Sequence, residues 1–407
     1  MKLKSLLVLS ASIFTALSSY ADTNTSPKVS GYMQFRLDSL SGDPMLFNNS
    51  GSGGQYQRPT TLGPSVGGPS NGFLVRRGRM KIEGPKSNLN NYVFQLDFGN
   101  MIPVNLRDAY VDLHEGMPKN TFVRVGQFPP PFTYILPYSS RLRESPDRPY
   151  GFSDSNYSAI LHKNSVSQLG GEFTPGSVVP LFLNQDREIG LQISNRYNNT
   201  STSFGLFNGE GRDTNGQRPL NSNLTFIGRI EQKLPQKNGN IFFGISKYDG
   251  AYSVRSSSPV NNNVTPFTLA DRSFTNIDSR WESKDGWIVR GEYLWGKFET
   301  TPDRSVFLKN NDVQSYYLTL TKNISNKTTI SSTFDVFKPI NKTLSNINPT
   351  DYEVKTLQGG ILHHLSDRTR LRLWYVRSLS DYDPSAAQGS YYRSKVNQII
   401  GEIQIEF

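Results

Sequence analysis

The chain has 407 residues, no cysteine and a formal net charge of +10. The lack of cysteine excludes disulfide frameworks, thiolate metal sites and lipid attachment to an N-terminal cysteine. The positive balance suits anionic solutes, anionic lipid head groups or nucleic acid. The sequence carries no nucleic-acid-binding motif, so we expect no nucleic-acid partner.

The first residues have the pattern of an export signal. Two lysines precede an apolar run over residues 6–17, and Ser-Tyr-Ala at 19–21 forms a small-x-small cleavage site. The run is too short for a membrane-spanning helix, and a short buried helix is the alternative. We expect residues 1–21 to be a cleaved signal peptide and residues 22–407 to form one domain. Export without disulfides is typical of a bacterial envelope.

The rest of the chain alternates apolar and polar residues with the period of two that predicts β-strands. No later stretch approaches the ~18 apolar residues of a spanning helix. The mean hydropathy is −0.50, which a membrane barrel allows because its inner half is wet. The predicted strands, in chain order, cover residues 28–38, 73–83, 92–98, 104–114, 121–128, 187–196, 201–208, 224–233, 241–248, 274–282, 287–295, 315–321, 328–336, 354–362, 369–376 and 396–407.

The predicted connections fall into two alternating classes. Every second one is tight, as at Asn198-Asn199 and Ser366-Asp367. Those between are long and polar, and only the one at 99–103 is short where a long one is expected. The long connections cover residues 39–71, 129–186, 209–222, 249–272, 298–312, 337–351 and 379–394. A soluble β-sandwich, the alternative, has no reason to separate its loops in this way.

We therefore predict an all-β fold, a transmembrane antiparallel β-barrel of about 16 strands with short periplasmic turns and long extracellular loops. The last predicted strand is amphipathic and ends on Phe407. This ending resembles the assembly signal of bacterial outer-membrane barrels, so we expect the protein in the bacterial outer membrane.

Polar side chains on the inner face decide what such a barrel transports. The strand at 73–83 places Arg77, Arg79 and Lys81 on one face, about 7 Å apart. Arg36 and Arg124 have the same predicted orientation, although a solvated basic face is the simpler alternative for such a stripe. The predicted inward acids are at least as numerous as the bases. Selectivity is therefore expected at the narrowest level, where clustered Arg and Lys select anions.

The connection at 129–186 adds further cations, Arg141, Arg143, Arg148 and Lys163, with tyrosines between them. If it folds into the barrel, it forms a constriction opposite the basic strand. Arginine suits an oxyanion because its planar fork donates two parallel hydrogen bonds. The alternative is an extracellular cover whose charges meet lipopolysaccharide.

Several segments of the first half resemble the phosphate-selective porin family. They are RRGRMKIEG at 76–84, QLDFG at 95–99, LRDAYVDL at 106–113, VRVGQFPPPF at 123–132, REIGLQIS at 187–194 and GLFNGEG at 205–211. The resemblance implies a homotrimer of sixteen-stranded barrels, an inward third loop and a ladder of arginines that guides phosphate-type anions. It assigns anion contacts to Arg76 and Arg77, and a proton-accepting role to Asp108. The second half of the chain resembles this family only in its pattern of barrel strands and loops.

Three classes of function follow. The first is a porin for small anions of the phosphate type, with outer-membrane lipid and lipopolysaccharide around it. The second is a general diffusion porin or a sugar-permeable channel. The third, a barrel enzyme, would need a nucleophile, base and acid together, and we do not expect it because only His114, His162, His363 and His364 are available. No cofactor is expected, and an adjacent histidine pair alone does not predict a metal site.

Overall fold

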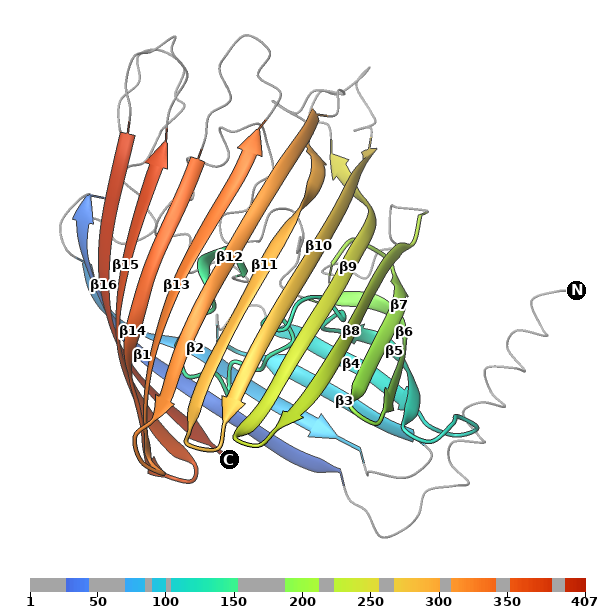
Figure 1. Cartoon of the computed structure of the whole chain (residues 1–407), viewed down its shortest axis with the longest axis horizontal. Coiled ribbons are helices and arrows are strands. Elements are labelled where there is room, and N and C mark those ends of the chain that lie inside the picture. Colours follow the sequence, from blue (N-terminus) through green and yellow to red (C-terminus); the bar gives the residue numbers. More distant parts are fainter. Residues whose placement is uncertain are drawn as a thin grey trace, which may run out of the picture.

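The structure is a computed structural model that describes residues 27–43, 70–84, 90–99, 104–152, 187–211, 223–255, 267–300, 309–341, 352–382 and 392–407. In these residues sixteen strands form a closed antiparallel barrel (Figure 1). Each strand pairs with its neighbours in the chain, and β1 closes the ring against β16. The predicted fold class is confirmed, and each of the sixteen predicted ranges overlaps one strand.

The strand bounds are β1 Lys28–Asp43, β2 Ser70–Glu83, β3 Asn90–Asp97, β4 Asn105–Leu113, β5 Thr121–Phe128, β6 Glu188–Tyr197, β7 Thr200–Phe207, β8 Thr225–Gln236, β9 Gly239–Arg255, β10 Phe267–Ser283, β11 Trp287–Thr300, β12 Lys309–Asn323, β13 Thr328–Asn341, β14 Tyr352–Ser366, β15 Thr369–Tyr382 and β16 Tyr392–Glu406. Among the described residues one 3-10 turn, η2, covers Tyr150–Phe152. No helix in the described part of the chain is long and apolar enough to span a membrane.

Alternation of side chains along each strand separates the two faces of the wall. In β12, Tyr316, Leu318 and Leu320 are exposed on the outer face. Their neighbours Thr319 and Thr321 are buried on the inner face. Successive side chains of a strand point to opposite faces, so the apolar outer residues form a band suited to lipid.

The ends of the chain close the ring through a close contact at Gly31. Its N–H donates to the carbonyl of Phe407 over 3.0 Å, and the Phe407 N–H donates back over 3.1 Å. A Cβ at Gly31 would lie 2.4 Å from the Phe407 ring. Only glycine fits there, so the terminal aromatic residue packs directly on the first strand.

The height of the wall differs from the prediction on one side. β9 and β10 pair as far as Arg255 and Phe267, so much of the predicted loop at 249–272 is strand. The ladder continues because its backbone groups can still pair where the sequence turns polar. In contrast, the strands from β3 to β7 have only 8 to 10 residues each. The barrel therefore has one low side.

The interior holds an apolar cluster that the alternation rule did not predict. Inward rings of the wall, including Phe207 and Phe274, pack with residues of the connection after β5 such as Phe132 and Phe152. Burying such a side chain contributes roughly 1.5–3 kcal/mol. The inner face is apolar here because another part of the chain, rather than water, covers it.

Candidate functional site

The connection that follows β5 runs against the inside of the wall over its described part, residues 129–152, which we call the inner segment (Figure 1). Both of its ends contact strands in the range from β9 to β13. The Thr133 N–H donates to the Ser246 hydroxyl of β9 over 3.0 Å. The Tyr150 N–H donates to Asp335 of β13, also over 3.0 Å. The ring of Phe152 packs edge-on against Tyr317 of β12.

Glu292 of β11 provides the strongest of these anchors. Its carboxylate accepts the backbone N–H groups of Tyr134 and Ile135 over 2.8 and 2.7 Å. It also accepts the Asn276 amide over 2.9 Å and the Tyr317 hydroxyl over 2.7 Å. Four donors hydrogen-bond to this one buried carboxylate, and two of them belong to the inner segment. Glu292 therefore holds the inner segment against the wall.

The middle of the inner segment is held by donors from β1, β2 and β15. Arg372 donates to the backbone carbonyls of Arg143 and Glu144 over 2.8 and 3.1 Å. Arg79 donates to the Ser140 hydroxyl over 2.9 Å and to the Tyr32 hydroxyl over 3.0 Å. Carboxylates of β11 and β13 therefore anchor the two ends of the inner segment, and arginines of β2 and β15 bind its middle.

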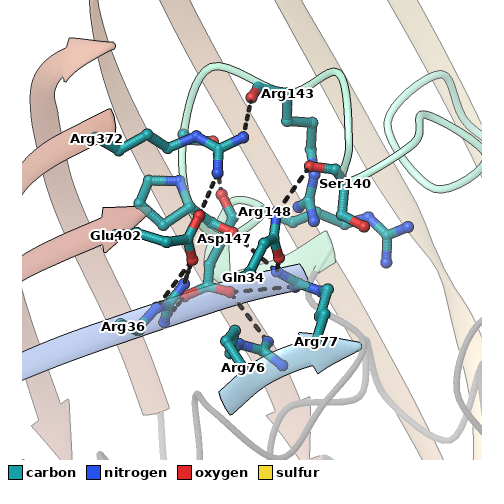
Figure 2. Close-up of polar contacts among 12 residues, drawn as sticks. Gln34, Arg36, Arg76, Arg77, Ser140, Arg143, Asp147, Arg148, Arg372 and Glu402 are labelled. Carbon is teal, nitrogen blue, oxygen red and sulfur yellow. Dashed lines mark hydrogen bonds and ion pairs between the residues drawn. The ribbon is translucent and has the colours of Figure 1, made fainter. Parts of the chain in front are cut away.

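Three arginines converge on Asp147 of the inner segment, and we call these four residues the Asp147 cluster (Figure 2). Oδ2 accepts from Arg36 Nη1 over 2.7 Å. Oδ1 accepts from Arg76 Nη2 over 3.0 Å and from Arg77 Nη2 over 3.4 Å. Burial alone would raise the pKa of Asp147, but the three guanidinium charges outweigh it and hold that pKa well below its usual value. Asp147 is thus an anion.

A β-bulge explains how two successive arginines reach the same carboxylate. Gln34 of β1 pairs with Arg77, and Phe35 pairs with Val75, so Arg76 has no partner in the ladder. A bulge inserts one residue into one strand and redirects its side chain. Strict alternation would point Arg76 toward the lipid. Instead Arg76 and Arg77 both face inward.

Around the Asp147 cluster the described charges leave an excess of cations. Glu402 of β16 pairs with Arg36 over 3.2 Å and also with Arg372. Asp38 lies 4.0 Å from Arg36. Four guanidinium groups of the wall therefore meet three carboxylates, and Arg143 and Arg148 of the inner segment are buried.

Two tyrosines of the inner segment form an aromatic face beside this region. Tyr134 and Tyr138 stack with ring centroids 5.4 Å apart. The guanidinium of Arg280 lies 4.5 Å from the Tyr134 ring centre, and that of Arg290 lies 5.4 Å from the Tyr138 ring centre. Burial raises the pKa of Tyr138 to about 12, with nearby Glu144 adding to the effect. Both rings therefore offer neutral hydroxyls between two cations.

The structure brings together some of the predicted site residues and separates others. Arg36, Arg76 and Arg77 meet at Asp147, and Arg79 lies beside them, bonded to Asp97 over 2.8 Å. The others have different partners. Lys81 pairs with Glu83, Asp108 with Arg187, Arg124 with Asp112 and Arg141 with Glu406, and Arg148 donates to the carbonyls of Ile135 and Leu136.

Several residues that build the site were missed at the level of sequence. Asp147 and Glu144 are not among the predicted site residues, because the prediction for this connection rests on its cations. The run Arg143-Glu-Ser-Pro-Asp-Arg148 places two acids between two bases, which is a usable signal for a segment that binds charged walls. Residues 1–21 and Lys163 lie outside the described residues. Among the described residues no group of three or more potential ligands could hold a metal ion.

A closed barrel of sixteen antiparallel strands with a long connection against its inner wall has the fold of outer-membrane porins. An anion-selective porin from Comamonas acidovorans has a similar structure, with a TM-score of 0.58 and 13% identity over 94% of this chain and 100% of that one. The outer membrane channel DcaP of Acinetobacter baumannii has a TM-score of 0.57 and 10% identity over 95% and 99% of the two chains.

A third similar structure is the trimer form of OmpT, an outer membrane protein of Vibrio cholerae. It has a TM-score of 0.53 and 9% identity over 94% of this chain and 99% of that one. The sequence itself matches no protein-family model and no curated protein. At these identities the likeness establishes the fold.

Proposed function

We propose that the protein is an outer-membrane porin through which small anions, phosphate-type oxyanions among them, diffuse passively. The fold supports a channel, and one of the similar structures is itself an anion-selective porin. The preference for anions follows from the charges that the inner segment and the wall place together.

The observation that carries this proposal is the convergence of Arg36, Arg76 and Arg77 at the inner segment. Clustered arginines at a narrow level attract anions and repel cations. Their planar forks match an oxyanion better than a lysine would. The surplus of guanidinium over carboxylate groups around the cluster keeps the local potential positive even though Asp147 is present.

A general diffusion porin is the second candidate, and ion pairing along the wall favours it. Arg229 pairs with Asp278 over 2.5 Å, and Arg124 pairs with Asp112 over 2.6 Å. Paired charges contribute little net field at a distance. If such pairs dominate the conduction path, small solutes of either sign, or sugars, pass with little discrimination.

The remaining parts of the proposal concern export and assembly. Residues 1–21 serve as a signal peptide, and the outer band meets membrane lipid and lipopolysaccharide. The low side supports a homotrimer, because strands of 8 to 10 residues at the usual barrel tilt span roughly 20 Å, less than the ~25 Å apolar band of such barrels. Another copy would cover this side, and a trimer form is known for one similar structure.

Planar bilayers test the proposal directly. Phosphate and pyrophosphate are titrated against the chloride current of the wild-type protein and of the double variant Arg77→Gln/Arg79→Gln. Saturable block that weakens in the double variant supports the oxyanion function, with Lys322→Gln/Lys327→Gln beside the tight turn between β12 and β13 as the charge-matched control. Anion preference without block would favour the general porin. Block that is unchanged in the double variant would remove Arg77 and Arg79 from the path.

A further inference from the structure

We propose that Arg36, Arg76 and Arg77 form a carboxylate-binding site whose resident occupant is the protein's own Asp147, and that carboxylate solutes bind there by displacing it. This inference rests on the proposed function as an anion channel and names one solute class for it. Asp147 would then be a built-in competitor that sets how tightly the site holds a passing anion.

The geometry around Asp147 is that of a filled ligand site. Its Oδ2 receives one guanidinium N–H over 2.7 Å, and its Oδ1 receives two, over 3.0 and 3.4 Å. The donors come from two neighbouring strands of the wall, and the acceptor comes from the inner segment (Figure 2). The head group of an organic acid has the same two oxygens in one plane, so it can replace Asp147 contact for contact.

The arginines have further partners that keep their positions independent of Asp147. Arg36 Nε donates to Glu402 over 3.2 Å. Arg77 Nη1 donates to Gln34 over 2.8 Å, and Gln34 donates in turn to Gln404 over 2.7 Å. The bulge fixes the direction of Arg76 through the backbone. A site with such support stays preorganised when its occupant leaves.

Asp147 is able to leave. Its side chain is 24% exposed, whereas that of Arg36 is fully buried. The inner segment has other anchors, at Glu292, Asp335 and Arg372. The rest of the inner segment is therefore held by contacts that do not depend on Asp147.

Competition by a tethered carboxylate suits a channel. A tethered ligand acts at an effective concentration in the millimolar range or above, so it weakens the apparent binding of every solute that must displace it. Conduction requires sites that attract an ion but also release it. Asp147 promotes release of the bound solute from the three arginines, because its carboxylate takes the place of the solute there.

The test compares Asp147→Asn with wild type in planar bilayers, with acetate, malonate and phosphate each titrated against the chloride current. The Asn side chain keeps the size of Asp but loses the competing charge. The concentration of acetate or malonate that halves the current should fall by about tenfold in the variant, the factor expected when the effective concentration of the tethered carboxylate is about ten times its own dissociation constant. Asp147→Ser, measured in parallel, provides the same answer if the Asn variant assembles poorly.

Glu144→Gln is the matched control, because Glu144 is the other acid of this stretch and binds Arg290 instead. An equal gain in the control, or no gain for carboxylates in either Asp147 variant, would overturn the inference. A gain confined to phosphate would overturn the carboxylate assignment. The proposed channel function is scored separately, from the ion selectivity of the wild-type protein, so the two can fail independently.

Discussion

Replacing Glu292 with alanine should release the inner segment from the wall while leaving the barrel closed. The carboxylate accepts two backbone N–H groups of the segment, from Tyr134 and Ile135. A hydrogen bond to a charged group contributes about 1.5–3 kcal/mol, so losing both should cost roughly 3–6 kcal/mol of docking free energy. The ladders between strands do not use this side chain, so the barrel itself should persist.

Amide hydrogen exchange measures this effect at the two donors. Since each ~1.4 kcal/mol is tenfold in an equilibrium constant, exchange of the Tyr134 and Ile135 amides should accelerate at least about 100-fold. Glu188→Ala is the control, because that buried carboxylate accepts instead from Gly211 N–H and the Tyr248 hydroxyl. Unchanged protection in Glu292→Ala, or equal acceleration in the control, would refute the assignment of Glu292 as the anchor.

Three further predictions concern glycines and a carboxyl group of the interior. Gly151→Val should displace the inner segment and change the single-channel conductance, because even a Cβ there would overlap a side chain of β12. Gly244→Ala should separate Arg229 from Asp278, since its Cβ would lie 2.4 Å from both side chains, and a lower unfolding temperature would show it. The low pKa of Asp147 stabilises the folded state above the unfolded pKa of about 3.9. The stability difference between wild type and Asp147→Asn should therefore stay constant from pH 8 to pH 5 and shrink only below about pH 4; a decline between pH 7 and pH 5 would contradict the arginine cluster.

The barrel could be predicted from sequence because a strand imposes a local rule. Alternation in a stretch such as residues 315–321 depends only on neighbours in the chain, and the structure places Tyr316 and Leu318 outside and Thr319 inside. Strand ends were less predictable. β9 extends to Arg255 because its backbone can pair with β10 wherever that strand is present, whatever the polarity of the side chains.

The site could be predicted only in part, because it depends on contacts between residues far apart in the chain. Arg36 and Arg77 were expected to face inward from the alternation alone. Arg76 required a bulge, which alternation cannot show, and only the family resemblance drew attention to it. Asp147 is separated from Arg36 by more than a hundred residues, and no local pattern pairs them.

The apolar interior shows the same limit. An inward Phe207 or Phe274 violates the expected alternation if the interior of the barrel is assumed to hold only water, because inward positions should then be polar. Both rings are instead covered by apolar residues, because Phe132 and its neighbours in the inner segment belong to the same buried cluster. The polarity of an inner face therefore depends on what occupies the interior.

The zero-current potential of the purified wild-type protein in a planar bilayer under a KCl gradient tests the central claim most directly. The surplus of arginine at the inner segment predicts a potential of the sign that marks chloride as the more permeant ion. A potential near zero would leave an unselective porin. A potential of the opposite sign would mean that the carboxylates govern the narrow level, and would contradict the assignment of the Asp147 cluster to anion passage.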